Sequence, residues 1–195
     1  MITVGIVIFP DVEELDFVAP FEVLSYVNKL QPNSTRVLLI APTLDPIKAY
    51  NGLRVLPDTT FEACPKLDIL LFPGGKGRTQ WMKEPRIHSF IHTQKPELTY
   101  LVSVCTGAFF LAEAGLLVNK KATTYHSAFE ELKHYGVEVI SQKVVHDGMI
   151  ITAGGVSSGL ELGFYLLAHL FGEAMAMNVA QKIEYSIDIP SLLTI

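Results

Sequence analysis

Residues 101–115 read Leu101-Val-Ser-Val-Cys105-Thr-Gly-Ala-Phe-Phe-Leu-Ala-Glu-Ala-Gly115, and this stretch decides the fold prediction. An apolar run typical of a buried strand passes into a helical pattern with no loop residues between them, and Cys105 stands at the junction. Such a sharp strand-to-helix turn needs small residues two positions away on either side, here Ser103 and Gly107. The stretch therefore predicts a nucleophile elbow with Cys105 as the nucleophile.

The position of Cys105 also predicts its reactivity. A sulfur at a helix N-terminus faces the positive end of the helix dipole and free N–H donors, which lower the pKa of a thiol and favour the thiolate. A lone cysteine is more often a small buried core residue, and we interpret Cys64, which stands in a loop, in that way. For Cys105 the small neighbours and the abrupt junction favour a nucleophile instead.

Short apolar runs alternate with helical patterns along the chain, and continuous apolarity is typical of parallel strands covered on both faces. These runs are Thr3–Phe9, Arg36–Ala41, Ile69–Phe72 and Thr99–Val104. Helices are expected over about Pro20–Leu30, Pro85–His92, Thr106–Ala114, Ser158–Phe171 and Glu173–Tyr185. Strand–helix–strand repetition with right-handed crossovers predicts a three-layer α/β/α sandwich. Its sheet is expected to be doubly wound, mainly parallel and flavodoxin-like, in one domain over residues 1–195.

Small antiparallel hairpin inserts are expected at two places. Asp147-Gly148 is a strong two-residue turn signal, and Asn51-Gly52 is a weaker one. The expected strand pairs are Lys143–His146 with Met149–Thr152, and Ile47–Tyr50 with Leu53–Leu56. Asp11 and Glu14 have the spacing of a capping box, which predicts a helix start near them. The last segment, 183–195, lacks a helical pattern at its end and is expected to cover a neighbouring surface.

The composition excludes several classes of protein. The chain has 195 residues, of which 49% are hydrophobic and 18% charged, with 15 Lys and Arg against 20 Asp and Glu. This balance excludes intrinsic disorder, two cysteines exclude a disulfide scaffold, and no basic cluster marks a nucleic-acid partner. Charged residues interrupt the most apolar stretch, Leu160–Ala180, and the N-terminus lacks signal-peptide features. We therefore expect a cytoplasmic protein with no membrane partner.

A glycine-rich stretch follows a predicted strand at Phe72-Pro-Gly-Gly75. Glycines there let backbone N–H groups approach a developing negative charge, so Gly74 and Gly75 are candidate oxyanion- and substrate-binding residues. Taken alone, the pattern is more often a plain glycine-rich turn.

Several motifs occur in order along nearly the whole chain. They are Leu15-Asp16-Phe-Val-Ala-Pro20-Phe-Glu22, Phe72-Pro-Gly-Gly75, Ser103-Val-Cys105-Thr106-Gly107, Gly115-Leu-Leu117, Lys121-Ala-Thr-Thr124 and Gly154-Gly-Val-Ser-Ser-Gly159. Together they resemble the ThiJ/PfpI superfamily, within the class I glutamine-amidotransferase-like fold, and its isonitrile hydratase branch in particular. The resemblance implies a lyase (a hydratase) that needs no cofactor, acts on a small molecule and forms a homodimer.

The resemblance also implies roles for individual residues. In isonitrile hydratases the elbow cysteine attacks the isonitrile carbon, and the thioimidate is hydrolysed to an N-substituted formamide. Carried over by motif, Cys105 is the nucleophile, Asp16 handles the proton and Thr106 contributes to the site. A thiolate suits a soft electrophilic carbon, and a carboxyl in an apolar setting can have a raised pKa and carry a proton. An equal alternative is that Asp16 is the N-cap of the helix before Pro20.

The chain departs from its relatives at several positions. Thr106 stands where peptidase-type relatives have His, and the late His169 and Glu173 are four apart, unlike the His-x-Glu of true amidotransferases. Tyr125 stands where isonitrile hydratases usually have His. The next residue, His126, either leans over the pocket, begins a helix or contacts a dimer partner.

Alternatives to the hydratase use the same elbow. They are a glyoxalase-like or amidase/peptidase-like thiol enzyme and a non-catalytic redox- or ligand-sensing protein in which Cys105 is oxidised. No metal is predicted, because His88 and His92 have the spacing of a metal pair but no third ligand stands out. An apolar subunit interface would account for the surplus of apolar residues, which supports a homodimer.

Overall fold

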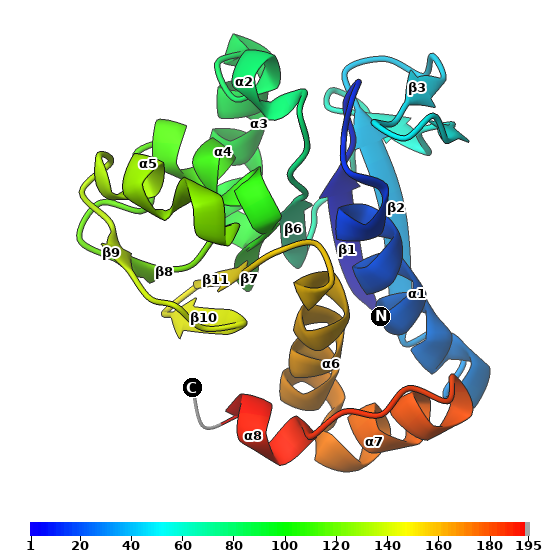
Figure 1. Ribbon diagram of the computed structural model, residues 1–195. Helices are drawn as coiled ribbons and strands as arrows, with labels where there is room; N and C mark the ends of the chain where they lie inside the picture. The colour runs from blue at the N-terminus through cyan, green and yellow to red at the C-terminus, as the bar shows by residue number, and fades with distance from the viewer. Residues whose placement is uncertain (194–195) are drawn as a thin grey trace.

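The computed structural model describes residues 1–193, with a seven-stranded sheet at its centre (Figure 1). In spatial order the strands are β10 (Val144–Asp147), β11 (Ile150–Ala153), β7 (Tyr100–Val104), β6 (Ile69–Phe72), β1 (Ile2–Val7), β2 (Thr35–Ala41) and β5 (Thr59–Thr60). All neighbours are parallel except β10 and β11, which confirms a mainly parallel sheet. Every residue of β6 is buried, which is why its sequence is continuously apolar.

Helices cover both faces of this sheet and give the three layers that the sequence predicts. They are α1 (Glu14–Leu30), α2 (Arg78–Trp81), α3 (Pro85–Gln94), α4 (Ala108–Glu113), α5 (Phe129–Lys133), α6 (Ser158–Phe171), α7 (Glu173–Lys182) and α8 (Ile189–Leu193). α1 and α6 lie side by side on one face (Figure 1). The β1–α1–β2 and β6–α3–β7 crossovers run in opposite directions along the sheet, so right-handedness places α3 on the other face.

The change of direction creates a crevice between β1 and β6. In doubly wound sheets this switch point, beyond the carboxyl ends of the strands, is where ligands bind. Below it the core is aromatic: the rings of Phe9 and Phe72 each lie 5.1 Å from that of Phe110. All three side chains are fully buried, so the crevice has a rigid floor.

The first helix differs from its prediction. α1 begins at Glu14, so the expected start at Pro20 is wrong and this proline lies inside the helix. A proline there costs one backbone hydrogen bond, which the burial of Phe17, Val23 and Leu24 offsets. A helix does start near Asp11 and Glu14, as expected, but the capping box is wrong, because residue 11 has a φ of 59° and the N-cap of α1 has no side-chain hydrogen bond.

Both predicted hairpins form, with changes. β3 (Ile47–Lys48) pairs antiparallel with β4 (Arg54–Val55) in a small separate sheet, as expected but with shorter strands. The β10–β11 hairpin turns at residues 148–149 and belongs to the central sheet, because β11 pairs with β7. A further small sheet, β8 (Lys121–Ala122) with β9 (Glu138–Val139), escaped prediction.

The C-terminal segment is more regular than expected. α8 forms over Ile189–Leu193, and the prediction that the tail covers a neighbouring surface falls partly on residues 194–195, which lie outside the described part of the chain. Among residues 1–193, no helix combines the length and apolar content needed to cross a bilayer.

Candidate active site

Cys105 occupies a strained junction between β7 and α4. Its φ is 55°, a conformation that residues other than glycine rarely adopt, and the side chain is buried. Two hydrogen bonds hold its backbone: the N–H donates to the Gly154 carbonyl over 2.7 Å, and its carbonyl accepts from Thr124 Oγ1 over 2.7 Å. Strain fixed in this way from both sides is typical of a functional residue.

Gly107 makes the sharp turn sterically feasible. A Cβ atom at this position would lie 1.9 Å from the carbonyl oxygen of Phe72, far inside contact distance. The turn begins with a 3₁₀ segment, Cys105–Gly107, before α4 proper starts. The chain therefore passes from strand to helix directly above β6, where only glycine fits.

Asp16 lies in the first turn of α1 and is fully buried. Its Oδ2 accepts a hydrogen bond from the Gly74 N–H over 2.8 Å, while Oδ1 has no partner among the described residues. Burial raises the pKa of Asp16 to about 7, helped by the nearby charge of Glu13 and opposed by the Gly74 N–H and by Cys105. The N-cap interpretation of Asp16 is wrong, because the helix begins before it.

The Cys105 thiol differs from its prediction in protonation. Burial, followed by the negative charge of Asp16, raises the pKa of Cys105 to about 12, although hydrogen bonds from Thr106 lower it. The expected effect of the helix N-terminus is outweighed, since α4 spans only Ala108–Glu113 and the sulfur is removed from water. The resting site is thus a thiol beside a carboxyl, and each shifts the pKa of the other.

Gly74 and Gly75 lie against the catalytic candidates. The Gly74 N–H is bonded to Asp16, and the Gly75 N–H donates to Thr106 Oγ1 over 3.2 Å. A Cβ at Gly74 would lie 2.5 Å from Thr106 Oγ1 and 3.0 Å from Asp16 Oδ2. Both amides are therefore engaged by the site itself, and they hold Asp16 and Thr106 in place.

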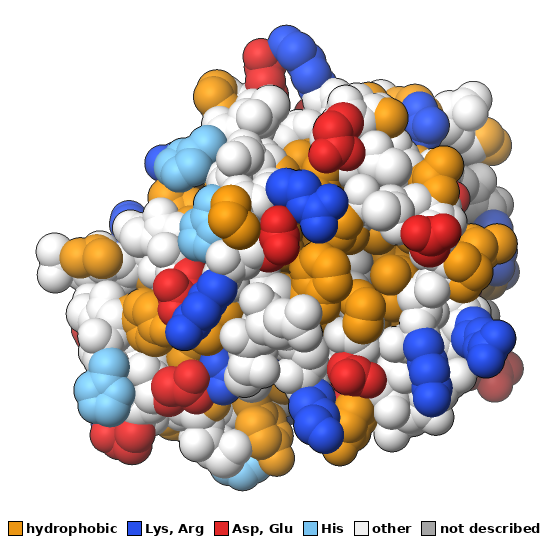
Figure 2. Space-filling model, turned by 90° about the horizontal axis from the view of Figure 1, so that it is seen from above, with side chains coloured by type: hydrophobic (Ala, Val, Ile, Leu, Met, Phe, Trp, Pro, Cys, Tyr) orange, Lys and Arg blue, Asp and Glu red, His pale blue; other side chains and the backbone are white. Residues whose placement is uncertain are grey.

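A cavity of about 530 Å³ opens above Cys105 at the switch-point crevice. Its walls are Glu13, Tyr50, Gly75, Lys76, Arg78, Thr79, Cys105, Thr106, Tyr125 and Val156. Seen from above Figure 1, hydrophobic side chains lie near the middle of the molecule with charged side chains around them (Figure 2). Asp16 does not line this cavity and lies sealed beneath it, so only Cys105 and Thr106 of the predicted catalytic residues meet the open space.

His126 does not join this cavity. It lines a neighbouring hollow with Thr124, and Tyr125 occupies the wall above Cys105 instead. The reason is local: His126 begins a 3₁₀ turn, so two adjacent residues face different hollows. Among its three interpretations, the start of a helical turn matches the structure.

The sequence did not identify four residues that contribute to the site, although two of them, Thr124 and Gly154, lie within its motifs. Thr124 and Gly154 secure the backbone of Cys105, and Glu13 faces the cavity with a pKa raised by burial and by Glu14. Arg78 lines the cavity and donates two hydrogen bonds to Glu131, over 2.9 and 2.7 Å. Its guanidinium carbon lies 4.0 Å from the centre of the Phe109 ring. These are long-range contacts, for which the sequence gives no local signal.

The remaining candidates have structural explanations. His88 Nε2 is 2.8 Å from the Met82 carbonyl, and residues 1–193 contain no group of three or more metal-ligating side chains. His169 contacts the carbonyl of Tyr165 in its own helix, far along α6 from the elbow. Cys64 is a free thiol that is only half-buried and packs against the core, so it is less buried than the core residue that we expected.

The fold and the site define a class: doubly wound α/β proteins with a cysteine at a strand-to-helix elbow beside a buried carboxyl. The chain belongs to the DJ-1/PfpI family, whose pattern matches residues 2–169. It is 36% identical over 183 residues to the isonitrile hydratase of Pseudomonas putida, covering 94% of this chain and 78% of that protein.

Two further relatives show the breadth of the family. The chain is 23% identical over 164 residues to a glutathione-independent glyoxalase of Caenorhabditis elegans, covering 83% of this chain and 84% of that protein. A crystal structure of a ThiJ/PfpI family protein from Pseudomonas syringae matches with a TM-score of 0.87 and 29% identity. That match covers 96% of this chain and 76% of the other.

Proposed function

We propose that this protein is a cysteine-dependent isonitrile hydratase, a lyase that converts an isonitrile and water into an N-substituted formamide without a cofactor. The observation that carries the proposal is the pairing of the Cys105 thiol with the buried Asp16 carboxyl, whose pKa of about 7 suits proton transfer at neutral pH. The 36% identity to a protein named isonitrile hydratase supports the choice of substrate.

The reaction proceeds in two stages. Asp16 takes the proton of the Cys105 thiol as the sulfur bonds to the terminal isonitrile carbon, and the carbon then receives that proton to give a thioimidate. Water adds to the thioimidate carbon, the carbon–sulfur bond breaks, and the thiol regains a proton as the formamide leaves. Thr106, hydrogen-bonded to the sulfur, stabilises its negative charge during both stages.

Formamide production from cyclohexyl isocyanide, followed by mass spectrometry, tests this proposal. Wild-type protein should turn over the isonitrile, and Cys105→Ala should abolish turnover. Cys64→Ser is the matched control and should keep it, because Cys64 does not line the cavity. An inactive wild type, or full activity in Cys105→Ala, would overturn the hydratase. The proposal places the enzyme in the cytoplasm, where reducing conditions keep Cys105 as a thiol.

A glyoxalase-like activity is the second candidate. The same sulfur would add to an aldehyde carbon, and the charged wall residues Lys76 and Arg78 favour a polar carbonyl substrate. Methylglyoxal consumption, measured beside the isonitrile assay, separates the two activities. If the wild-type protein had neither activity and mild peroxide oxidised Cys105, a redox sensor would be favoured instead.

A further inference from the structure

The β3–β4 hairpin stands apart from the central sheet and contributes Tyr50 to the lining of the Cys105 cavity. Its base is anchored, because the side chains of Ile47 and Ala49 are buried. Its tip is open: Tyr50 is 50% exposed and lines the cavity, whereas Leu53, 48% exposed, does not. A tyrosine ring left half in water at a cavity wall is available to a ligand.

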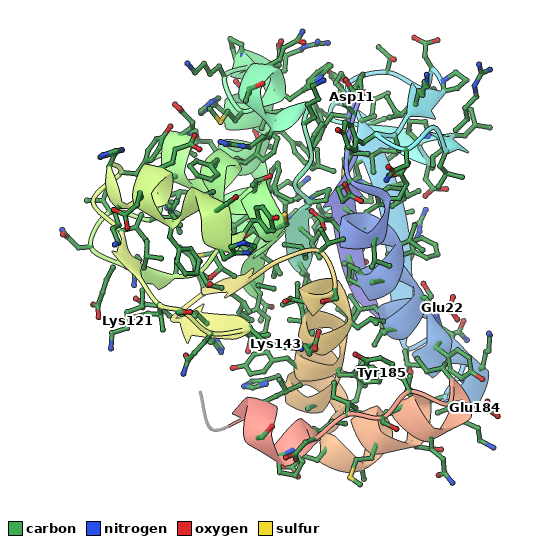
Figure 3. The ribbon with its side chains drawn as sticks, in the orientation of Figure 1. Asp11, Glu22, Lys121, Lys143, Glu184 and Tyr185 are labelled. Carbon is green, nitrogen blue, oxygen red and sulfur yellow. The ribbon has the colours of Figure 1, made fainter. Side chains whose placement is uncertain are left out.

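Backbone hydrogen bonds fix the hairpin to the loop before α1. The N–H of Asp11, labelled in Figure 3, donates to the Lys48 carbonyl over 3.0 Å, and the Tyr50 N–H donates to the Val12 carbonyl over 2.9 Å. On its other side the same loop pairs with the glycine loop through a bridge between Val12 and Gly75. The position of Tyr50 is thereby tied to the residues that surround Cys105.

The Glu14 carboxylate adds two side-chain hydrogen bonds to these backbone contacts. Its Oε1 accepts from the Asn51 N–H over 2.7 Å, and its Oε2 accepts from Asn51 Nδ2 over 2.7 Å. Burial raises the pKa of Glu14, but hydrogen bonds, among them those from Asn51, lower it by more. The Glu14 carboxylate that holds Asn51 is therefore charged at neutral pH. Charge-assisted bonds of this kind are stronger than neutral ones.

We propose that this hairpin is the substrate-selecting wall of the cavity. Tyr50 contacts the organic group of the substrate in the cavity that Tyr125 and Val156 also line. Glu14 is a positioning residue, which acts through Asn51. The substrate class is isonitriles with an aromatic or bulky apolar group, and this identification rests on the proposed function.

Kinetics with benzyl isocyanide and methyl isocyanide test the wall. Wild type should prefer the benzyl compound, and Tyr50→Ala should reduce the ratio of the two kcat/KM values about tenfold, through the KM for the benzyl compound. Tyr50→Phe should retain the preference, since the ring remains. Glu14→Ala should reduce it less than Tyr50→Ala does, and Glu14→Gln should restore part of it because an amide oxygen still accepts from Asn51.

Leu53→Ala is the matched control, because it shortens an exposed apolar side chain on the same hairpin outside the cavity. It should leave the preference at the wild-type value. An unchanged preference in Tyr50→Ala, or an equal loss in Leu53→Ala, would overturn the proposal.

A second measurement is independent of isonitrile chemistry. In a Cys64→Ser background, iodoacetamide and N-benzyl iodoacetamide alkylate Cys105: a carbon–sulfur bond forms, iodide leaves and the thiol proton passes to solvent. The benzyl reagent should react faster, and Tyr50→Ala should remove the difference. Wild type that hydrates no isonitrile, but shows this preference and loses it in Tyr50→Ala, would contradict the proposed hydratase activity. It would still support the proposal that Tyr50 selects the organic group of the ligand. Equal rates for both reagents in wild type would overturn the proposal that the hairpin selects the substrate.

Discussion

The backbone N–H of Gly74 donates to Oδ2 of the buried Asp16 carboxyl over 2.8 Å, and the Cys105 side chain is its second hydrogen-bonding neighbour. These two hydrogen bonds do not compensate the loss of water, so the pKa of Asp16 is raised to about 7. Because the pKa of Cys105 is higher still, the pair keeps a proton on sulfur at rest and Asp16 is ready to accept it.

Removing the Asp16 charge should make Cys105 more reactive and less catalytic. The carboxylate is one cause of the raised thiol pKa, so Asp16→Asn should increase the iodoacetamide alkylation rate near pH 8, by about tenfold for each pKa unit recovered. Formamide production should fall about 100-fold or more, because the proton acceptor is gone. Glu22→Gln, on the exposed surface of α1, should change neither rate. A slower alkylation in Asp16→Asn would contradict this account of the thiol pKa.

The buried carboxyl should also make the protein less stable as the pH rises. Below about pH 4 Asp16 is protonated in the folded and unfolded chains, so its burial costs little. Between about pH 4 and pH 7 the unfolded chain ionises while the folded one resists, and stability is lost as the pH passes through the folded pKa of about 7. At about 1.4 kcal/mol for each pKa unit, wild type should lose about 4 kcal/mol more than Asp16→Asn over this range.

Urea unfolding of the two proteins at several pH values between about 4 and 8 measures this difference, since other titrating groups cancel in the comparison. Parallel stability curves for wild type and Asp16→Asn would show that Asp16 titrates normally.

The elbow has a steric requirement that a second pair of variants tests. Gly107→Ala would place Cβ 1.9 Å from the Phe72 carbonyl oxygen, which forces a backbone shift and should cost about 3 kcal/mol or more. Gly154→Ala is the control, because its Cβ would lie 3.5 Å from Ser158 Oγ, an ordinary contact. Thermal unfolding should separate the two variants clearly, and equal melting temperatures would mean that β6 can yield.

The parts of the site that the sequence predicted depend on neighbours along the chain. The strand-to-helix elbow is one example, since the apolar run, Cys105 and the helical pattern adjoin in the sequence, whereas the steric need for Gly107 comes from Phe72 in β6. The parts that it missed depend on distant residues. The pKa of Cys105 follows from burial and from Asp16, and the amides of the glycine loop are occupied by side chains from α1 and the elbow. No local pattern contains that information.

The same distinction explains the errors in the fold. Pro20 is a reliable helix-start signal in isolation, but packing of α1 against α6 extends the helix through it. Tyr125 lines the cavity in place of His126, because a 3₁₀ turn that the sequence does not indicate begins at His126 and turns its side chain to a neighbouring hollow.

The homodimer remains a prediction, and exposed apolar side chains indicate where to test it. Leu15 and Val18 on α1 are each 40% exposed, and further exposed apolar side chains lie on and near the hairpin tied to α1 by Glu14: Leu44, Leu53 and Leu56. Val18→Asp should convert a dimer into a monomer in sedimentation velocity. Val118→Asp, at an exposed valine in the turn between α4 and β8, is the control and should leave the dimer intact. A monomeric wild type would contradict the prediction.

Two adjacent threonines give the sharpest test of how the strained elbow is held. Thr124 Oγ1 donates to the Cys105 carbonyl over 2.7 Å in a buried setting, whereas Thr123 Oγ1 has no hydrogen-bond partner among the described residues. Thr124→Val should leave a buried carbonyl unsatisfied and cost about 1–3 kcal/mol, while Thr123→Val should be neutral or stabilising.

The two variants should also differ in activity. Loss of the Thr124 bond releases one of the two contacts that fix φ of Cys105 at 55°, so Thr124→Val should lower kcat for formamide production and Thr123→Val should not. Urea unfolding and steady-state kinetics on both variants supply the measurements. If the two lost equal stability and activity, the hydroxyl of Thr124 would be unimportant, and the Cys105 elbow would depend on Gly107 and the Gly154 carbonyl alone.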